Sequence, residues 1–390
     1  MPKSLTQLQD KKVGLVLSGG IVRAAAWHLG VCYALDDLGF QFPHHSQERS
    51  TEHCIDISTI VGSSAGGLIG VFLSQGLTPQ EIIDAVLGKN KYIKKLRYRD
   101  MLYLKRPKLK TLKADFFSPY KELPLALQLI LKTANSMSGF FSTEGLKKYL
   151  LTNIIQNDLF EDLALDLFII GTQLDHSRKV IFSKYNYPNP GHDSTANYYT
   201  GYQISDAVSA SMAVPPFYTP YPIMNPLTQQ VDHYIDGEIR ETLSTHVAID
   251  NHCDVVISSW THTPYHYHDE IGSLAHYGIP AIITQSLYLM IQKKIVSHRA
   301  QLATSKDIID TVFSYMKSEK FNTKHQNDII KILEKKLNYR QSTKLIDIFP
   351  DHNDYDLFFT NSFSLDPKRM ESMMRKGYKK TIEVFNRAFD

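Results

Sequence analysis

The sequence contains few cysteines and no long uninterrupted apolar run. Its 390 residues include three scattered cysteines, an odd number without paired spacing, which argues against a disulfide framework and indicates reduced thiols. The amino terminus lacks the apolar core of a secretory signal. The longest apolar stretches, 123–131 and 279–291, are short or interrupted, whereas a membrane-spanning helix needs about 18 apolar residues. The sequence therefore predicts a cytoplasmic protein without a transmembrane helix.

A large net charge is also lacking, since the formal value is +3, which is too small to indicate nucleic-acid binding. Positive charge is instead concentrated in residues 89–113, where eleven lysines and arginines accompany a single acidic residue, Asp100. Tyrosines and aliphatic residues alternate with these cations. The pattern fits either a solvated face or a peripheral contact with anionic lipid headgroups. The candidate membrane contacts are Lys94, Lys95, Arg97, Arg99, Lys105 and Arg106.

Short apolar runs alternate with helical patterns along the first two thirds of the chain. Residues 13–17, 58–61, 166–171 and 254–258 are predicted strands, and residues 22–38 and 65–75 are predicted helices. Continuous apolar strands that alternate with helices indicate an α/β protein with a largely parallel sheet covered on both faces. From residue 284 onward the chain is more polar and mostly helical in pattern, ending in a predicted helix at 367–389.

The segment IVGSSAGGLIGV (60–71) contains Gly62-x-Ser64-x-Gly66 between a predicted strand and a predicted helix. This context is the one that a nucleophile elbow requires, and its spacing selects Ser64 rather than Ser63. The helix that follows would direct its amino-terminal N–H groups at the reacting oxygen. The alternative is a glycine-rich turn that only allows close helix packing.

Two further segments offer the partners that a nucleophilic serine needs. Residues 18–23 follow a strand and open a helix, so their backbone N–H groups could face a developing negative charge. A dinucleotide-binding turn is disfavoured there because Ile21 and Ala24 occupy the later glycine positions. Asp236 precedes Gly237 at the end of the predicted strand 231–235, a position where a simple turn is more common.

The sixteen histidines leave other sites open. A Ser–Asp–His triad would use one of three histidines downstream of Asp236, namely His246, His252 and His262. His262, His266, His268 and Asp269 could also bind a metal, although their spacing matches no strong metal motif and favours a polar loop.

A series of segments resembles the patatin-like phospholipases in order and spacing. They are VLSGGIVRAAAWHLGV (16–31), IVGSSAGGLIG (60–70), ASMAVPPFYTP (210–220) and YIDGE (234–238), with weaker likeness at 140–150, 168–183 and 358–385. The resemblance implies a three-layer α/β/α patatin-like fold with a largely parallel central sheet, followed by a helical C-terminal extension. It divides the chain into a catalytic domain at 11–260, with a basic and apolar cap insertion at about 89–138, and a mostly helical region at 261–390 that packs on it.

The same resemblance implies a lipid acylhydrolase with a Ser–Asp dyad, no metal and no cofactor. By match, Ser64 is the nucleophile, flanked by Gly62 and Gly66 of the elbow, and Asp236 is the base. The matched oxyanion loop comprises Gly19, Gly20, Ile21, Val22 and Arg23. The implied substrates are fatty-acyl esters of membrane lipids, as for a phospholipase A or lysophospholipase.

This sequence departs from the family pattern at Ile21 and Ala24, where glycines are usual, and at Glu238, where glycine or alanine usually follows the Asp-Gly pair. A positive φ at Ile21 would be costly. Two alternatives therefore stay open: a lipase for neutral lipids, and a family member that binds lipid or a partner without turnover.

Overall fold

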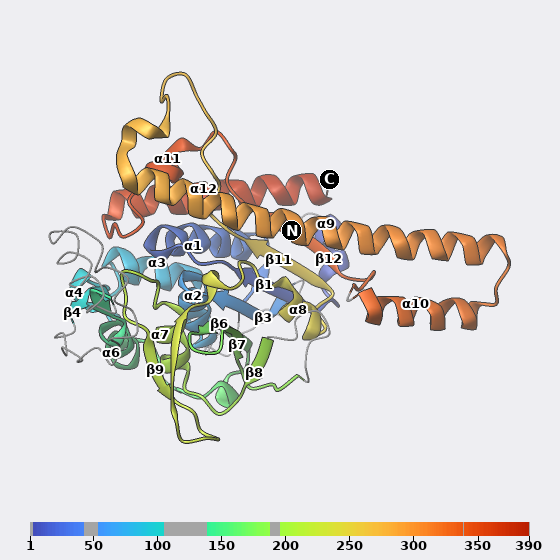
Figure 1. The fold of residues 1–390 in the computed structure, drawn as a ribbon, viewed down its shortest axis with the longest axis horizontal. Coiled ribbons are helices and arrows are strands. Elements are labelled where there is room, and N and C mark those ends of the chain that lie inside the picture. Colours follow the sequence, from blue (N-terminus) through green and yellow to red (C-terminus); the bar gives the residue numbers. More distant parts are fainter. Residues whose placement is uncertain (1–2, 43–53, 105–138, 188–195, 338, 390) are drawn as a thin grey trace, which may run out of the picture.

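A computed structural model describes residues 3–42, 54–104, 139–187, 196–337 and 339–389. In these residues one mixed sheet of ten strands forms the centre of the molecule, with the main order β12-β11-β1-β3-β6-β10-β9 (Figure 1). The strands are β1 (Val13–Leu17), β2 (Phe40–Gln41), β3 (Ile55–Ser63), β6 (Asp166–Gln173), β7 (Arg178–Phe182), β8 (Ala196–Tyr199), β9 (Tyr221–Met224), β10 (Val231–Asp236), β11 (Val255–Ser259) and β12 (Lys344–Ile348). From β12 to β6 neighbouring strands run parallel. β10 joins β6 in the antiparallel direction.

The central strands are apolar on both faces because helices cover both sides of the sheet. Leu15, Leu17 and Ile169 point into a core on one face, and Val16, Val61 and Phe168 point into a second core on the other. Alternate residues of a strand face opposite sides, so these two cores define the outer layers. The three-layer α/β/α architecture that the resemblance implied is therefore present.

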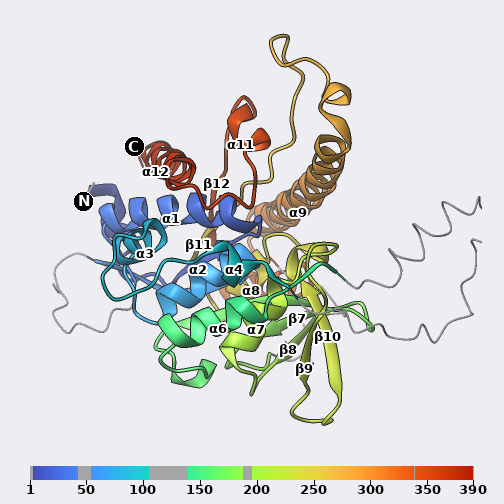
Figure 2. The ribbon, with the colours of Figure 1, turned by 90° about the vertical axis from the view of Figure 1, so that its left-hand side faces the viewer.

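Helices α1 (Ile21–Asp37), α2 (Ala65–Ser74), α3 (Pro79–Leu87) and α12 (Pro367–Phe389) contribute to the first core. α1 and α12, from opposite ends of the chain, lie side by side in Figures 1 and 2. Every residue of α2 is buried, as expected for a helix that is apolar on all sides. Helix α8 (Thr245–Asp250) and part of α9 (Gly278–Ser318) cover the second core.

The remaining elements are short or lie outside the sheet. They are α4 (Tyr98–Met101), α6 (Glu144–Asn153), α7 (Ile204–Ser211), α10 (Thr323–Leu337), α11 (Tyr355–Phe359), the strand pair β4 (Tyr103–Leu104) and β5 (Phe141–Ser142), and the 3-10 helices η1 (Lys3–Leu8), η3 (Phe160–Asp162), η4 (Gly237–Ile239) and η5 (Leu274–Tyr277).

The C-terminal region differs from the expected helical extension in one respect: it supplies β12, which pairs in parallel with β11 and extends the sheet. The strand Lys344–Ile348 was missed because it is short and lies among helical patterns. The predicted strand 13–17 and the predicted helix 367–389 are confirmed with the same bounds. The predicted contacts Lys105 and Arg106 and the apolar stretch 123–131 lie outside the described residues.

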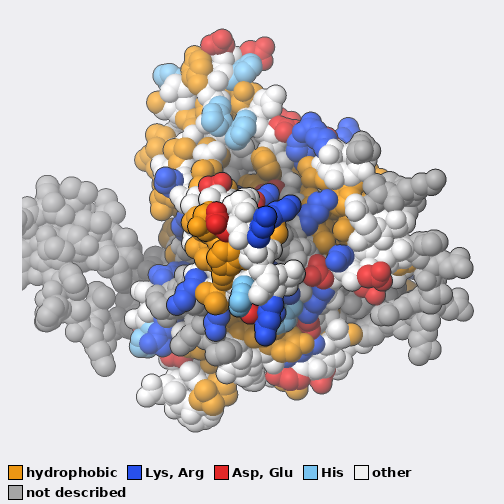
Figure 3. Space-filling model, turned by 90° about the vertical axis from the view of Figure 1, so that its right-hand side faces the viewer, with side chains coloured by type: hydrophobic (Ala, Val, Ile, Leu, Met, Phe, Trp, Pro, Cys, Tyr) orange, Lys and Arg blue, Asp and Glu red, His pale blue; other side chains and the backbone are white. Residues whose placement is uncertain are grey.

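Helices α9 and α10 form a hairpin that projects from the sheet (Figure 1). Figure 3 views the molecule from the side on which this hairpin projects, and hydrophobic side chains are mixed with charged ones there. Within the described residues, one segment, Leu274–Ser318, is long and apolar enough to cross a membrane by length and composition, with a mean hydropathy of 1.2 in its most apolar window. A search for uninterrupted apolar runs does not single out this segment, because polar residues such as Thr284 and Gln285 interrupt it. These residues are uncharged, so the mean hydropathy of the segment remains high. Tyr288 and Ile295 of this helix are nevertheless buried against the rest of the protein.

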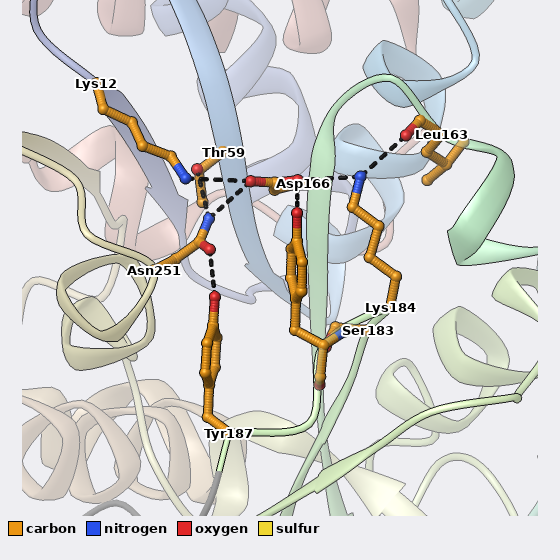
Figure 4. Close-up of polar contacts among 9 residues, drawn as sticks. Lys12, Thr59, Leu163, Asp166, Ser183, Lys184, Tyr187 and Asn251 are labelled. Atoms are coloured by element: carbon orange, nitrogen blue, oxygen red, sulfur yellow. Dashed lines mark hydrogen bonds and ion pairs between the residues drawn. The ribbon is translucent and has the colours of Figure 1, made fainter.

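A polar network closes the amino ends of the parallel strands (Figure 4). Asp166, at the start of β6, accepts hydrogen bonds from Asn251 (3.0 Å) and Tyr185 (2.9 Å) and pairs with Lys12 (3.2 Å) and Lys184 (3.0 Å). Burial by itself would raise the pKa of Asp166, but the hydrogen bonds from Asn251, Lys184 and Tyr185 keep it below its ordinary value. The network therefore stabilises the end of the sheet at which the parallel strands begin, opposite to the end that carries Ser64.

Candidate active site

Ser64 lies at the carboxyl edge of the sheet, in the turn between β3 and α2. Its backbone has φ 50° and ψ −119°, a positive φ that is unusual for serine and that fits the strained turn expected of a nucleophile elbow. The flanking glycines are required sterically. A Cβ on Gly62 would lie 2.4 Å from the nitrogen of Gly67, and a Cβ on Gly66 would lie 2.2 Å from the carbonyl oxygen of Leu17.

Asp236 ends β10 and faces Ser64. The N–H of Glu238 donates to its Oδ1 at 2.9 Å, and a side-chain hydrogen bond with Ser64 also acts on the pKa of its carboxyl group. Its backbone is fixed as well, because the Asp236 N–H donates to the Ala213 carbonyl (3.1 Å) and the Thr172 hydroxyl donates to the Asp236 carbonyl (3.1 Å). Burial raises the pKa of Asp236 to about 7, although both hydrogen bonds to its carboxylate oppose the shift. A carboxylate with this pKa is a better base than an exposed one.

The loop matched to an oxyanion hole lies beside this pair. Gly20 has φ 131°, and Ile21 has φ 59° in the left-handed region, so the cost anticipated for a β-branched residue here is present. The Gly19 N–H donates to Oε1 of Glu238 at 2.6 Å. Gly20 and Ile21 stand at the first turn of α1, where backbone N–H groups have no acceptor within the helix.

Val22 and Arg23, which were also matched to the oxyanion loop, are engaged elsewhere. Their backbone N–H groups donate to the Ser362 carbonyl at 3.0 and 3.3 Å. The Arg23 side chain donates to the Leu357 carbonyl at 2.6 Å and lies over the Tyr288 ring, 5.4 Å from its centroid. Burial lowers the pKa of Arg23 to about 10. In this structure these two residues attach the loop to the C-terminal region instead of presenting donors to Ser64.

Sequence reasoning missed the residues that hold the elbow and the loop in place. Ser211 accepts the Ser64 N–H at 2.8 Å, and His28 donates from Nε2 to the Ser18 carbonyl at 2.9 Å. Both residues lie inside the quoted segments 210–220 and 16–31, but their contacts join distant parts of the chain. Glu238 was noted only as a departure from the family pattern, without a role.

A narrow apolar cavity of about 40 Å³ begins beside the elbow and the loop. Ile21 and Met212 line it next to the site, and Leu68 lines it one turn beyond Ser64. It continues between α1, α2 and α6 to Phe72, Leu146 and Met370. The lining is apolar and offers nothing to a charged ligand, and a space of about 40 Å³ holds only a small part of an acyl chain unless the lining side chains move apart.

Two of the three histidines of the alternative triad, His246 and His262, make other contacts. His246 lies 3.3 Å from Glu241 and 3.1 Å from the Lys179 ammonium group. His262 packs on the Tyr288 ring beside Gly20, and burial lowers its pKa to about 3. Within the residues that the structure describes, no three His, Cys, Asp or Glu side chains are arranged to hold a metal ion.

Comparison with known proteins identifies the family of the chain. The family model of the patatin-like phospholipases matches residues 15–249, which include Ser64, Asp236 and the glycine loop. No curated protein matches the chain. Because the family model covers more than half of the sequence, the chain belongs to the patatin-like phospholipases, a family of lipid acyl hydrolases.

Proposed function

We propose that this protein hydrolyses fatty-acyl esters of membrane glycerolipids, as a phospholipase A or lysophospholipase, through a Ser64–Asp236 dyad. The observation that carries the proposal is the position of Ser64 beside the buried Asp236 carboxyl group, whose pKa is raised by burial and lowered by a side-chain hydrogen bond with Ser64. The strained backbone of Ser64 and the apolar cavity beside it support the same reaction.

In the first half of the reaction, Asp236 takes the proton of the Ser64 hydroxyl while Oγ attacks the ester carbonyl carbon. The carbonyl oxygen becomes an oxyanion, which N–H groups of the loop at residues 19–21 would stabilise. The tetrahedral intermediate then collapses, the bond to the lipid alcohol breaks, and Asp236 returns the proton to the departing oxygen. In the second half, Asp236 takes a proton from water, the resulting hydroxide attacks the acyl-enzyme, and the fatty acid leaves as Ser64 regains its proton.

Labelling with a fluorophosphonate tests the nucleophile. Wild-type protein is expected to react at Ser64 and to lose esterase activity in proportion to labelling. Ser63→Ala is the matched control, because it removes the neighbouring hydroxyl from the same turn, and it should still react. Labelling that persists in Ser64→Ala, or a folded wild-type protein that does not react, would contradict the dyad and favour a family member that only binds lipid.

We also propose that the protein works at a membrane surface, in part through the basic segment at 89–104. Ile93 and Met101 are buried and anchor this segment, whereas Arg97, Tyr92 and Tyr98 are exposed. Lys94 and Arg99 are exposed as well, and Lys95 is half-buried. Exposed cations beside exposed tyrosines suit anionic headgroups and the interfacial layer.

Helix α9 adds an apolar surface to the same proposal. No charged residue occurs from Leu274 to Gln292, and Ile279, Ile283 and Met290 are more than half exposed. Lys293 and Lys294 follow directly. Tyr288 of this helix contacts Arg23 and His262 beside the glycine loop, so this part of α9 lies close to the proposed site.

Vesicle binding tests the membrane contact. Arg97→Glu is expected to weaken binding to vesicles of phosphatidylcholine and phosphatidylserine several-fold, more strongly at low salt. Lys11→Glu, an equal charge change at an exposed residue near the amino edge of the sheet, should have little effect. Equal affinities of wild-type protein and both variants would contradict the membrane contact and indicate that the basic segment is only a solvated face.

A further inference from the structure

Glu238 occupies an unexpected place between the glycine loop and the nucleophile. Its Oε1 accepts the Gly19 N–H at 2.6 Å, a short hydrogen bond. A Cβ built on Gly19 would lie 2.5 Å from Cγ of Glu238 and 2.8 Å from Cβ of Ser64. The glutamate side chain and the nucleophile therefore flank the same glycine.

An oxygen of a carboxyl group at this position resembles the oxyanion of an ester under attack. Both are oxygen acceptors, and both seek a backbone N–H at short distance. The Gly19 N–H carries a single hydrogen, so it cannot donate fully to Glu238 and to a substrate at once.

We propose that Glu238 fills the oxyanion position of the resting enzyme and that an ester carbonyl must displace its carboxyl group from Gly19 before Ser64 reacts. This inference rests on the proposed Ser64–Asp236 dyad and adds a gating residue to it. Glu238 is thus a residue that determines how readily the site accepts an ester.

The local backbone allows such a displacement without disturbing the base. The N–H of Glu238 donates to Oδ1 of Asp236, and this contact depends on the backbone and not on the glutamate side chain. A rotation of that side chain would free Gly19 while the η4 turn and the dyad remain in place.

The surroundings of Glu238 also link it to the base. Burial, followed by the charge of Asp236, raises the pKa of Glu238 to about 8, whereas the Gly19 N–H and the Thr242 and Ser63 hydroxyls oppose the shift. Asp236 is the ionisable group that acts on Glu238. Because Asp236 has the lower pKa of the two, it ionises while Glu238 is still protonated, so loss of the Glu238 carboxyl should open the loop and leave the ionisation of Asp236 to burial and its own hydrogen bonds.

The test compares three variants of the full chain, Glu238→Ala, Glu238→Gln and Ile239→Ala. The measurements are kcat/KM for p-nitrophenyl butyrate, a soluble short-chain ester, and the rate of fluorophosphonate labelling at Ser64. We expect Glu238→Ala to increase both rates about tenfold, because it removes an internal hydrogen bond that the substrate must replace. Glu238→Gln keeps the size and a carbonyl acceptor and should stay within about twofold of wild type. Ile239→Ala truncates the next, exposed side chain and should leave both rates unchanged.

Further readouts separate gating from general effects. The lower apparent pKa of the kcat/KM profile should stay near the wild-type value in Glu238→Ala, because Asp236 remains the base while the rate above that pKa rises. Unfolding curves establish that each variant is folded; if Glu238→Ala is not, Glu238→Gly takes its place. A loss of rate in the truncated variant together with near wild-type rates in Glu238→Gln would overturn the gate and make Glu238 a contributor to catalysis. Unchanged rates in both would overturn it too. Activity that survives Ser64→Ala in the Glu238→Ala background would instead refute the dyad itself.

Discussion

The hydroxyl of Ser211 accepts the backbone N–H of Ser64 at 2.8 Å and donates to the Ile170 carbonyl at 2.6 Å. One side chain at the end of α7 thereby fixes the strained turn of the nucleophile to the neighbouring strand β6. The contact holds the Ser64 backbone in its positive φ while the Ser64 side chain remains available to Asp236.

We expect Ser211→Ala to lower kcat about tenfold, because the elbow loses the contact that positions it and small misplacements are costly in catalysis. The free energy of unfolding should fall by about 1 kcal/mol. Ser209→Ala is the matched control, since Ser209 is equally buried on the same helix but donates only to the Ser205 carbonyl. Equal loss of kcat in the two variants would show that Ser211 has no special role.

The pH dependence of hydrolysis should report Asp236. Since burial raises its pKa to about 7, the ionised base becomes populated as the pH rises through 7. We expect kcat/KM for a soluble ester to rise about tenfold per pH unit below that value and to level off above it. Background hydrolysis is measured with Ser64→Ala. A profile that is flat from pH 5 to 8 would contradict this role of Asp236.

The same pKa predicts a cost in stability. A carboxyl whose pKa is raised on folding binds its proton more tightly in the folded state, so its ionisation destabilises the protein above pH 7 and not below about pH 4. Asp236→Asn should increase the free energy of unfolding by an amount on the order of 3 kcal/mol at pH 8, and the gain should vanish near pH 4. Urea unfolding at the two pH values measures this difference. A gain of equal size at both would disprove the link to ionisation.

The apolar cavity beside the elbow should determine the choice of acyl chain. Leu146→Phe is expected to reduce hydrolysis of palmitoyl esters relative to butyryl esters about tenfold, because the larger ring obstructs the far part of the cavity. Leu150→Phe places the same substitution one turn later on α6, at a buried residue that does not line the cavity. An unchanged chain-length preference in Leu146→Phe would exclude the cavity as the acyl site.

The Asp166 network should affect stability and leave the chemistry intact. Asp166→Asn is expected to lower the free energy of unfolding by about 2 kcal/mol at pH 7, since its hydrogen bonds to charged partners weaken. Because the pKa of Asp166 is held below its ordinary value, the difference should shrink as the pH falls below about 4. Asp175→Asn, at an exposed position, serves as the control. A marked loss of kcat in folded Asp166→Asn would contradict a purely structural role.

Local patterns in the sequence were sufficient for much of the fold. Residues 13–17 and 367–389 form the predicted strand and helix because their apolar residues follow a single period over the whole element. β12 was missed, since a five-residue edge strand owes its conformation to its neighbour β11 and not to its own pattern.

The candidate site was predictable where one short motif defines it and not where distant segments meet. The spacing around Ser64 indicated the elbow, whereas Asp236 required the resemblance to a family. The contact between Gly19 and Glu238 joins residues 219 positions apart, which no local pattern can reveal. The strain at Ile21 was anticipated, because a β-branched residue replaces a usual glycine there.

The most direct test of the account is hydrolysis of phosphatidylcholine by purified protein, with fatty acid and lysophospholipid measured together for wild type, Ser64→Ala, Asp236→Asn and the control Ser63→Ala. The account predicts that wild type and Ser63→Ala release both products, and that Ser64→Ala and Asp236→Asn release neither while unfolding as cooperatively as wild type. Fatty-acid release by folded Ser64→Ala or Asp236→Asn at the wild-type rate would contradict the Ser64–Asp236 dyad.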